Sequence, residues 1–112
     1  WGKRFAVDCH TMAAQGPPVG PDPGEGRPHA CVGTGRGSFP GDWALALAAS
    51  LGRHLEGEVT VDQPFSGGAI TRAKAGGIPW VQIELSRAPW MTFEEKGRRV
   101  FQALRELLAI LP

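Results

Sequence analysis

The sequence has no long apolar run and almost no net charge. No stretch approaches the roughly 18 to 20 apolar residues that a helix needs to span a bilayer, and the first residues show no charged start followed by an apolar core and a cleavage site. We therefore expect a cytoplasmic protein that does not enter a membrane. The net charge is +1 and the arginines are scattered, which argues against nucleic acid or an anionic membrane as a partner. The oligomeric state stays open.

The sequence also lacks several common catalytic and metal-binding motifs. Its two cysteines, Cys9 and Cys31, do not form the spaced pairs of a structural zinc site. Both lie in apolar, strand-like contexts, where we expect buried free thiols rather than a disulfide. The segment GTGRG (33–37) is not followed by the Lys-Ser/Thr pair of a phosphate loop, and no serine sits in a nucleophile elbow. Nucleotide binding and nucleophilic catalysis are therefore not expected.

What is present is the composition of one small domain of alternating strands and helices. The chain has 112 residues, of which 42% are hydrophobic and 21% are charged. Apolar alternation predicts strands at 4–10, 30–33, 58–64 and within 77–91. Glycine and proline dominate 13–28, which predicts a long loop without helix or strand pairing, and the paired glycines of 65–77 predict a second loop.

Two helices are predicted by apolar residues at helical spacing. The first is expected to be capped by Asp42 and to end at Gly57 in the left-handed conformation. Its buried stripe is Trp43, Leu47, Leu51 and Leu55. The second begins with a capping box formed by Thr92 and Glu95. Its apolar face comprises Phe93, Val100, Phe101, Leu104, Leu107, Leu108 and Leu111. This order of elements predicts an α/β layered domain with a mostly parallel or mixed sheet of about four strands flanked by helices.

Glu84 is the residue that this layout leaves unexplained. It lies in a strand among Val81, Ile83 and Leu85, where an ionised carboxylate without partners loses several kcal/mol of solvation. The carboxylate must therefore be paired, protonated, bound to a metal or open to a cleft. The simplest interpretation is a structural ion pair with Arg72, because strand alternation places the adjacent Arg87 on the other face.

His10 raises the same question at the end of the first predicted strand. A histidine that shares its face with Asp8 is most often a hydrogen-bonded structural residue. Ligands in open α/β sheets nevertheless collect at the carboxyl ends of strands, and both His10 and Glu84 lie near such ends. The two residues could therefore meet in one cleft.

Three segments suggest a family. VDCHTM (7–12), VDQPFSGGAITR (61–72) and VQIELSRAPWM (81–91), in that order, resemble the C-terminal half of the N-formylglutamate amidohydrolase family. That family is typified by Asp-x-His-Ser/Thr-Met, Asn-x-Pro-Phe/Tyr-x-Gly-Gly-x-Ile-Thr and Gln-Ile-Glu-Ile/Leu-x-Arg segments. Its fold is similar to that of the zinc-dependent exopeptidases, which belong to the phosphorylase/hydrolase-like class. The resemblance implies hydrolysis of N-formyl or N-acyl amino acids.

The resemblance also implies roles for particular residues. His10 would be a zinc ligand, with Asp8 behind it orienting the imidazole. Glu84 would be the general base, taking a proton from zinc-bound water and passing it to the departing amine. Arg72 would hold a substrate carboxylate.

The turn at Gly67 and Gly68 would bring backbone amides close to the substrate. If the chain is not catalytic, the same amides and Arg72 would make it a module that binds a small carboxylate.

Some positions depart from the family pattern. Asp62 stands where the family usually has Asn, and His29 stands where an Asp usually follows Arg-Pro, so substrate preference is expected to differ. A catalytic zinc usually takes three protein ligands, and the matched segments supply only His10. The chain opens at Trp1 without an initiator methionine. We therefore expect either the C-terminal part of a longer amidohydrolase domain or a reduced relative that has lost activity.

Overall fold

The computed structural model of the chain describes residues 5–35, 37, 39–67 and 78–111. Its elements are β1 (Ala6–Met12), β2 (Ala30–Gly33), α1 (Gly41–Leu55), β3 (Val59–Val61), β4 (Trp80–Ser86) and α3 (Phe93–Ile110). The strands form one sheet in the order β1-β4-β2-β3. β1 runs parallel to β4 and β2 runs parallel to β3, whereas β2 and β4 are antiparallel. The sheet is therefore mixed, and the predicted α/β class with four strands and two helices is confirmed.

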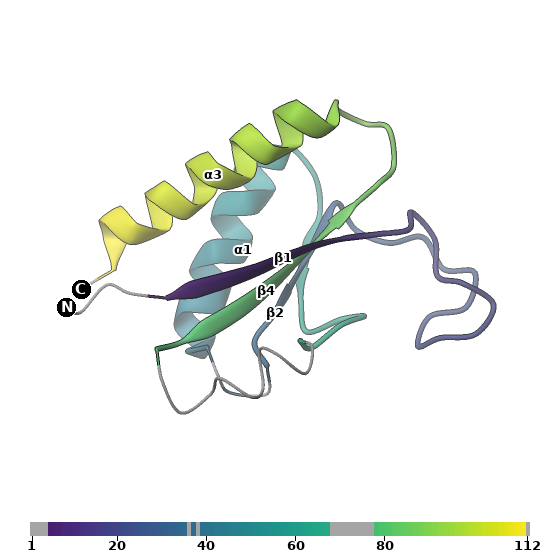
Figure 1. Cartoon of the computed structure of the whole chain (residues 1–112), viewed down its shortest axis with the longest axis horizontal. Coiled ribbons are helices and arrows are strands. Elements are labelled where there is room, and N and C mark those ends of the chain that lie inside the picture. Colours follow the sequence, from purple (N-terminus) through teal and green to yellow (C-terminus); the bar gives the residue numbers. More distant parts are fainter. Residues whose placement is uncertain (1–4, 36, 38, 68–77, 112) are drawn as a thin grey trace.

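Both helices cover the same face of the sheet (Figure 1). Val81, Ile83 and Leu85 of β4 alternate onto this face and are buried against it. Leu47, Leu51 and Leu55 of α1 are buried in the same core, as the sequence predicted. Because successive strand residues point to opposite faces, the residues between these apolar ones point away from the helices.

Helix α1 differs from the prediction at both ends. Its N-cap is Pro40, which makes no side-chain cap, and Asp42 lies within the first turn. At the other end Glu56, not Gly57, takes the left-handed conformation, with φ 56°. Gly57 is needed for space instead, because a Cβ there would lie 2.1 Å from the His29 ring.

Helix α3 confirms the predicted cap and corrects the predicted stripe. The Thr92 hydroxyl accepts a hydrogen bond from the Glu95 amide at 3.2 Å. Val100 and Leu107 are buried, but Phe93 and Phe101 are more than 60% exposed. The helix packs mainly against α1, so only the side of its apolar surface that faces α1 and the sheet is covered.

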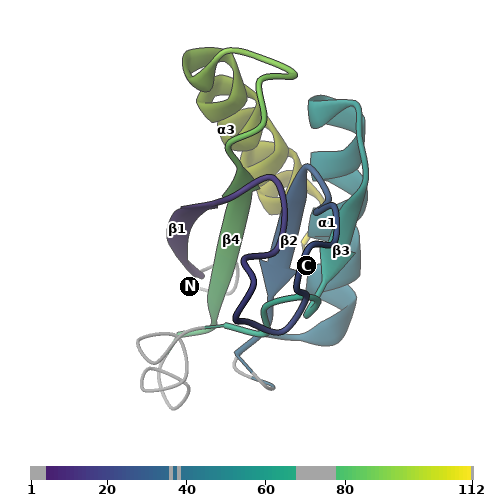
Figure 2. The ribbon, with the colours of Figure 1, turned by 90° about the vertical axis from the view of Figure 1, so that its right-hand side faces the viewer.

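The Gly/Pro-rich segment 13–28 projects beyond the end of β1 and returns to β2 (Figures 1 and 2). The prediction that it forms no strand pairing is wrong at one point, since Gln15 and Gly26 make an isolated antiparallel bridge. The Gly16 amide also donates to the Glu25 carbonyl at 2.8 Å. This segment and its neighbours bound the polar side of the sheet described below.

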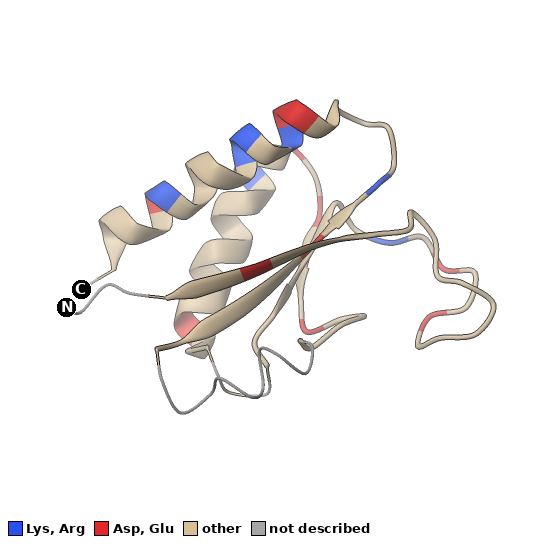
Figure 3. Ribbon diagram, viewed as in Figure 1, with Lys and Arg blue, Asp and Glu red and all other residues tan. Residues whose placement is uncertain are grey.

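Charged residues are dispersed over α1, α3, the strands and the loops (Figure 3). No described helix is long and apolar enough to cross a membrane.

Candidate functional site

The polar face of the sheet is set by the pairing of β1 with β4. In this parallel ladder His10 lies opposite Glu84, and Asp8 lies opposite Gln82. Cys31 of β2 flanks Glu84 on its other side. Adjacent strands lie about 4.8 Å apart and paired residues share a face. The side chains of these two pairs therefore lie on one surface, with His10 and Glu84 nearer the carboxyl ends of their strands than Asp8 and Gln82.

His10 is held by the acid two residues before it. Its Nε2 lies 2.8 Å from Asp8 Oδ1, in the contact that the resemblance implied. The His10 side chain is 50% exposed and that of Asp8 is 20% exposed. Because this contact uses Nε2, the ring presents Nδ1 for a further ligand.

Glu84 is half-buried and makes no ion pair with a described residue. The Gln82 amide donates a hydrogen bond to its Oε2 at 2.7 Å. Burial raises the pKa of the Glu84 carboxyl above its usual value, and Asp8 adds to that rise, while His10, Gln82 and Arg27 oppose it. A carboxylate with a raised pKa is a stronger proton acceptor, which is the property that a general base requires.

A hollow opens at Glu84 and is called the Glu84 hollow below. Its walls are Thr11, Met12 and Ala13 at the end of β1, Pro17, Val19, Gly20 and Pro21 of the Gly/Pro-rich segment, and Arg27, Phe65, Glu84 and Arg87. His10 does not line it and borders a neighbouring hollow with Cys9 and Phe93. The two residues are therefore neighbours on the sheet face, but the expected common cleft is not formed by the described residues.

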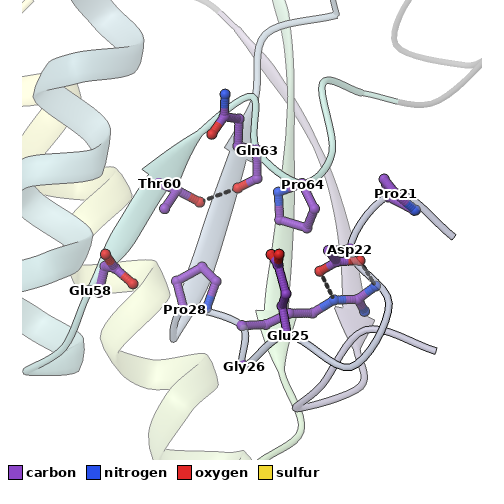
Figure 4. Close-up of a pocket in the computed structure, with 10 residues that line it drawn as sticks. Pro21, Asp22, Glu25, Gly26, Pro28, Glu58, Thr60, Gln63 and Pro64 are labelled. Atoms are coloured by element: carbon purple, nitrogen blue, oxygen red, sulfur yellow. Dashed lines mark hydrogen bonds and ion pairs between the residues drawn. The ribbon is translucent and has the colours of Figure 1, made fainter. Parts of the chain in front are cut away.

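Arg27 lines the Glu84 hollow and is paired with Asp22. Its guanidinium binds Asp22 through two hydrogen bonds of 2.9 Å and lies 4.9 Å from the centre of the Phe65 ring. This pair lowers the pKa of Asp22. Figure 4 shows Asp22 at a second hollow on the β3 side, where Glu25, Glu58 and Thr60 also lie.

Arg87 lies at the other wall of the Glu84 hollow and is exposed. Its Nη1 donates to Thr11 Oγ1 at 3.2 Å, and its amide donates to the Met12 carbonyl at 2.9 Å. It makes no ion pair with Glu84, as strand alternation predicted.

The predicted glycine turn is described only at its start. Gly67 has φ 120°, which favours glycine, and its amide nitrogen lies 2.8 Å from where a Cβ on Gly33 would be. Gly68 and Arg72 lie outside the described residues. The ion pair expected between Arg72 and Glu84 therefore stays a prediction.

Asp62 replaces the usual Asn in a conformation that both residues tolerate. Its φ is 61°, in the left-handed region. Its carboxylate accepts hydrogen bonds from the Thr34 amide and hydroxyl, both at 2.8 Å. The departure from the family pattern therefore has a structural role within the turn.

Comparison with known proteins decides the family. The sequence profile of the N-formylglutamate amidohydrolase family matches residues 1–91. The chain belongs to this family. The crystal structure of an N-formylglutamate amidohydrolase from Ralstonia eutropha JMP134 has the same fold, with a TM-score of 0.56 and 18% sequence identity. The match covers 94% of this chain and 41% of that one. No curated protein matches the sequence.

The described residues of this N-formylglutamate amidohydrolase family member do not form a complete zinc site. No group of three or more His, Cys, Asp or Glu side chains comes together in the described ranges. His10, with its carboxylate partner Asp8, fits one donor position. Catalytic zinc usually takes three protein ligands, and among the described residues the expected set is represented by His10 as a candidate donor.

The sequence did not predict the contacts that surround Glu84. Strand alternation did place Gln82 on the same face, and the pairing of β2 with β4 adds Cys31. Arg27 and Phe65 come from loops, whose paths cannot be read from periodicity. Both cysteines are free, but Cys9 is exposed, so the prediction that it is buried is wrong.

Proposed function

We propose that this chain contributes the general base and part of the metal site of a zinc-dependent hydrolase of N-formyl or N-acyl amino acids. The observation that carries the proposal is Glu84, a half-buried acid with a raised pKa on the polar face of the sheet, opposite His10. The chain spans 41% of the related crystal structure. We propose accordingly that it is the C-terminal part of a longer amidohydrolase domain.

Glu84 would take the proton of the water that attacks the acyl carbon. It would then deliver this proton to the amine nitrogen as the amide bond breaks. The products are a carboxylic acid and a free amino acid. The raised pKa suits both halves of this task, because the group must first accept a proton and then return it.

His10 would be one of the zinc donors, with the remaining donors outside the described residues. The contact with Asp8 would fix the orientation of the ring. When bound, zinc would supply Lewis-acid activation of water and of the substrate carbonyl. Arg72 would hold a substrate carboxylate, with backbone amides near Gly67 and Gly68 beside it.

The test is a pair of measurements on the complete protein. Metal analysis is expected to find bound zinc, and His10→Ala is expected to lose it. Glu84→Gln is expected to reduce kcat for N-formyl amino acids by about 100-fold or more while zinc stays bound. Glu58→Gln, at the separate hollow of Figure 4, is the matched control and should keep full activity. A protein without zinc, or a Glu84→Gln variant as fast as the parent, defeats the proposal.

A carboxylate-binding module is the alternative, with Arg72 and the backbone amides near Gly67 and Gly68 as its binding groups. The same face would then hold a small carboxylate without hydrolysing it. Such binding would be indifferent to chelators, whereas zinc-dependent hydrolysis would stop when zinc is removed. In either case we propose a cytoplasmic location, where the free thiols of Cys9 and Cys31 would stay reduced.

A further inference from the structure

Arg87 occupies the first position after β4, at the wall of the Glu84 hollow. It is exposed and reaches one described partner through its side chain, the hydroxyl of Thr11. No acidic side chain among the described residues lies within ion-pair distance of it. A guanidinium has five N–H donors, so most of the donors of Arg87 are available to a ligand.

The backbone on both sides of Arg87 is held by a buried lysine. Lys96 Nζ donates to the carbonyl of Ser86 at 2.7 Å and to that of Ala88 at 2.6 Å. The Arg87 amide donates in turn to the Met12 carbonyl at 2.9 Å. The peptide units around Arg87 are therefore fixed by three hydrogen bonds to α3 and to the end of β1.

Lys96 is itself enclosed. Its side chain is 3% exposed, and its ammonium lies 4.2 Å from the centre of the Trp90 ring, which stacks on His29 at 3.8 Å. Burial lowers the pKa of Lys96. Burying an ammonium is unfavourable unless its hydrogen bonds are made. Here these bonds are made to the turn that carries Arg87.

A rigid turn lowers the entropic cost of binding because the backbone that carries the cation needs no ordering when the ligand arrives. The other described arginine of the hollow, Arg27, is different. Its guanidinium is engaged on both sides by Asp22 and by the Phe65 ring. Arg87 is thus the better placed of the two for an external anion.

We infer that Arg87 binds the α-carboxylate of the substrate, which leaves Arg72 for a side-chain carboxylate such as that of glutamate, and that Lys96 is the positioning residue of Arg87. The inference rests on the proposed function for the identity of the ligand, an N-acyl amino acid. The α-carboxylate is common to all members of that class, and the guanidinium fork matches it in two parallel hydrogen bonds. The lining of the same hollow includes the apolar residues Met12, Phe65 and Val19, which suit the substrate's side chain, and Glu84, the proposed general base.

The first test compares substrates with and without the α-carboxylate in the complete protein. Arg87→Gln is expected to raise KM about 10-fold to 100-fold for both N-formylalanine and N-formylglutamate. It should leave N-formylalaninamide, whose α-carboxylate is blocked, unchanged. Arg98→Gln, at an exposed arginine of α3 paired with Glu95, is the control and should change nothing. An equal loss with the amide, no loss at all, or a loss confined to N-formylglutamate overturns the assignment.

The second test measures binding without catalysis. In a Glu84→Gln background, titration calorimetry with N-formylalanine should show that adding Arg87→Gln weakens binding by the same factor. If Arg87 binds the carboxylate but the protein hydrolyses nothing, the proposed function is wrong and this inference stands. If the protein hydrolyses its substrate but its affinity for the carboxylate does not depend on Arg87, the proposed function stands and this inference is wrong.

The positioning role of Lys96 is tested by a double-mutant cycle. Lys96→Met should weaken N-formylalanine binding, leave the amide unaffected, and add nothing in the Arg87→Gln background, because it acts through Arg87. Lys96→Gln, which keeps a donor for the two carbonyls, is the milder second variant and should show the same pattern with a smaller effect. Additive losses, or equal losses for the acid and the amide, overturn that role.

Discussion

His10 and Glu84 lie opposite each other on the parallel strands β1 and β4. The pairing of β1 with β4 brings together two residues that are far apart in the sequence. Both lie on the face of the sheet that the helices leave uncovered. Asp8 touches His10, and Gln82 touches Glu84, so each of the two has its own polar partner one pleat further back. These partners offset only part of the cost of burying the Glu84 carboxylate. The effect of that remaining cost on the unfolding free energy can be measured.

Glu84→Gln is expected to stabilise the fold at neutral pH by about 1 kcal/mol, as is common when an active-site charge is removed. Burial raises the pKa of Glu84 in the folded state. Below its usual value of 4.5 the group is neutral in both the folded and the unfolded chain, and no penalty arises. As pH rises through the folded pKa, the penalty of the ionised group develops and becomes complete above it.

The difference in unfolding free energy between variant and parent should therefore be near zero at about pH 4 and largest at about pH 8. Urea denaturation followed by circular dichroism measures it. Glu58→Gln, at an exposed site, should leave the pH profile unchanged. A Glu84→Gln variant less stable than the parent at high pH would contradict the argument.

Asp62→Asn is expected to change the unfolding free energy by less than about 0.5 kcal/mol. Asparagine adopts the left-handed conformation as readily as aspartate and retains an acceptor for Thr34. Asp62→Ala should cost about 2 to 3 kcal/mol, because it loses these hydrogen bonds and strains the backbone. Thermal and urea unfolding compare the two variants. If Asn costs as much as Ala, the charge of Asp62 matters and the structural explanation is wrong.

Much of the fold followed from local pattern. Alternation in 77–91 predicted both β4 and the face of Glu84, because a strand with one covered face has only one register that buries Ile83 and Leu85. The N-cap at Thr92, which accepts a hydrogen bond from the Glu95 amide, likewise followed from residues three apart. The loop contacts of Arg27 did not follow, because they depend on the path of a segment without periodicity.

The predictions of the end of α1 and of the buried face of α3 were wrong for a related reason. Gly57 fits a C-cap pattern, yet the left-handed position is taken by Glu56, and Gly57 instead packs directly against the His29 ring. Phe101 has the spacing of a core residue, but it is exposed, because α1 and the strands do not extend far enough to cover it. Tertiary contacts overrode local preference at both positions.

One side of α3 is buried and the other is exposed, so truncating a side chain on each side should change the unfolding free energy by different amounts. Leu107→Ala is expected to destabilise the protein by about 2 to 5 kcal/mol, because Leu107 is fully buried and the change leaves a cavity. Phe101→Ala should cost less than about 1 kcal/mol, because that ring is 62% exposed. Equilibrium urea unfolding measures both. Equal costs would mean that the outer surface of α3 is covered in solution.

Gly57→Ala is expected to destabilise the protein by about 1 to 3 kcal/mol. The added Cβ would lie 2.1 to 2.4 Å from atoms of the His29 ring, and that ring is stacked on Trp90, which limits its retreat. Gly97→Ala is the matched control. A Cβ there meets nothing within 4 Å inside an exposed helical turn, so it should stabilise α3 by up to about 1 kcal/mol.

The double variant Gly57→Ala/His29→Ala separates steric conflict from backbone strain. Removing the ring removes the atoms that the new Cβ would meet, so the cost of Gly57→Ala should largely disappear when it is measured against His29→Ala alone. A cost that persists in this background would locate the strain in the backbone at the end of α1. In that case Gly57 would be needed for its conformation after all, and the assignment of the left-handed position to Glu56 alone would have to be revised.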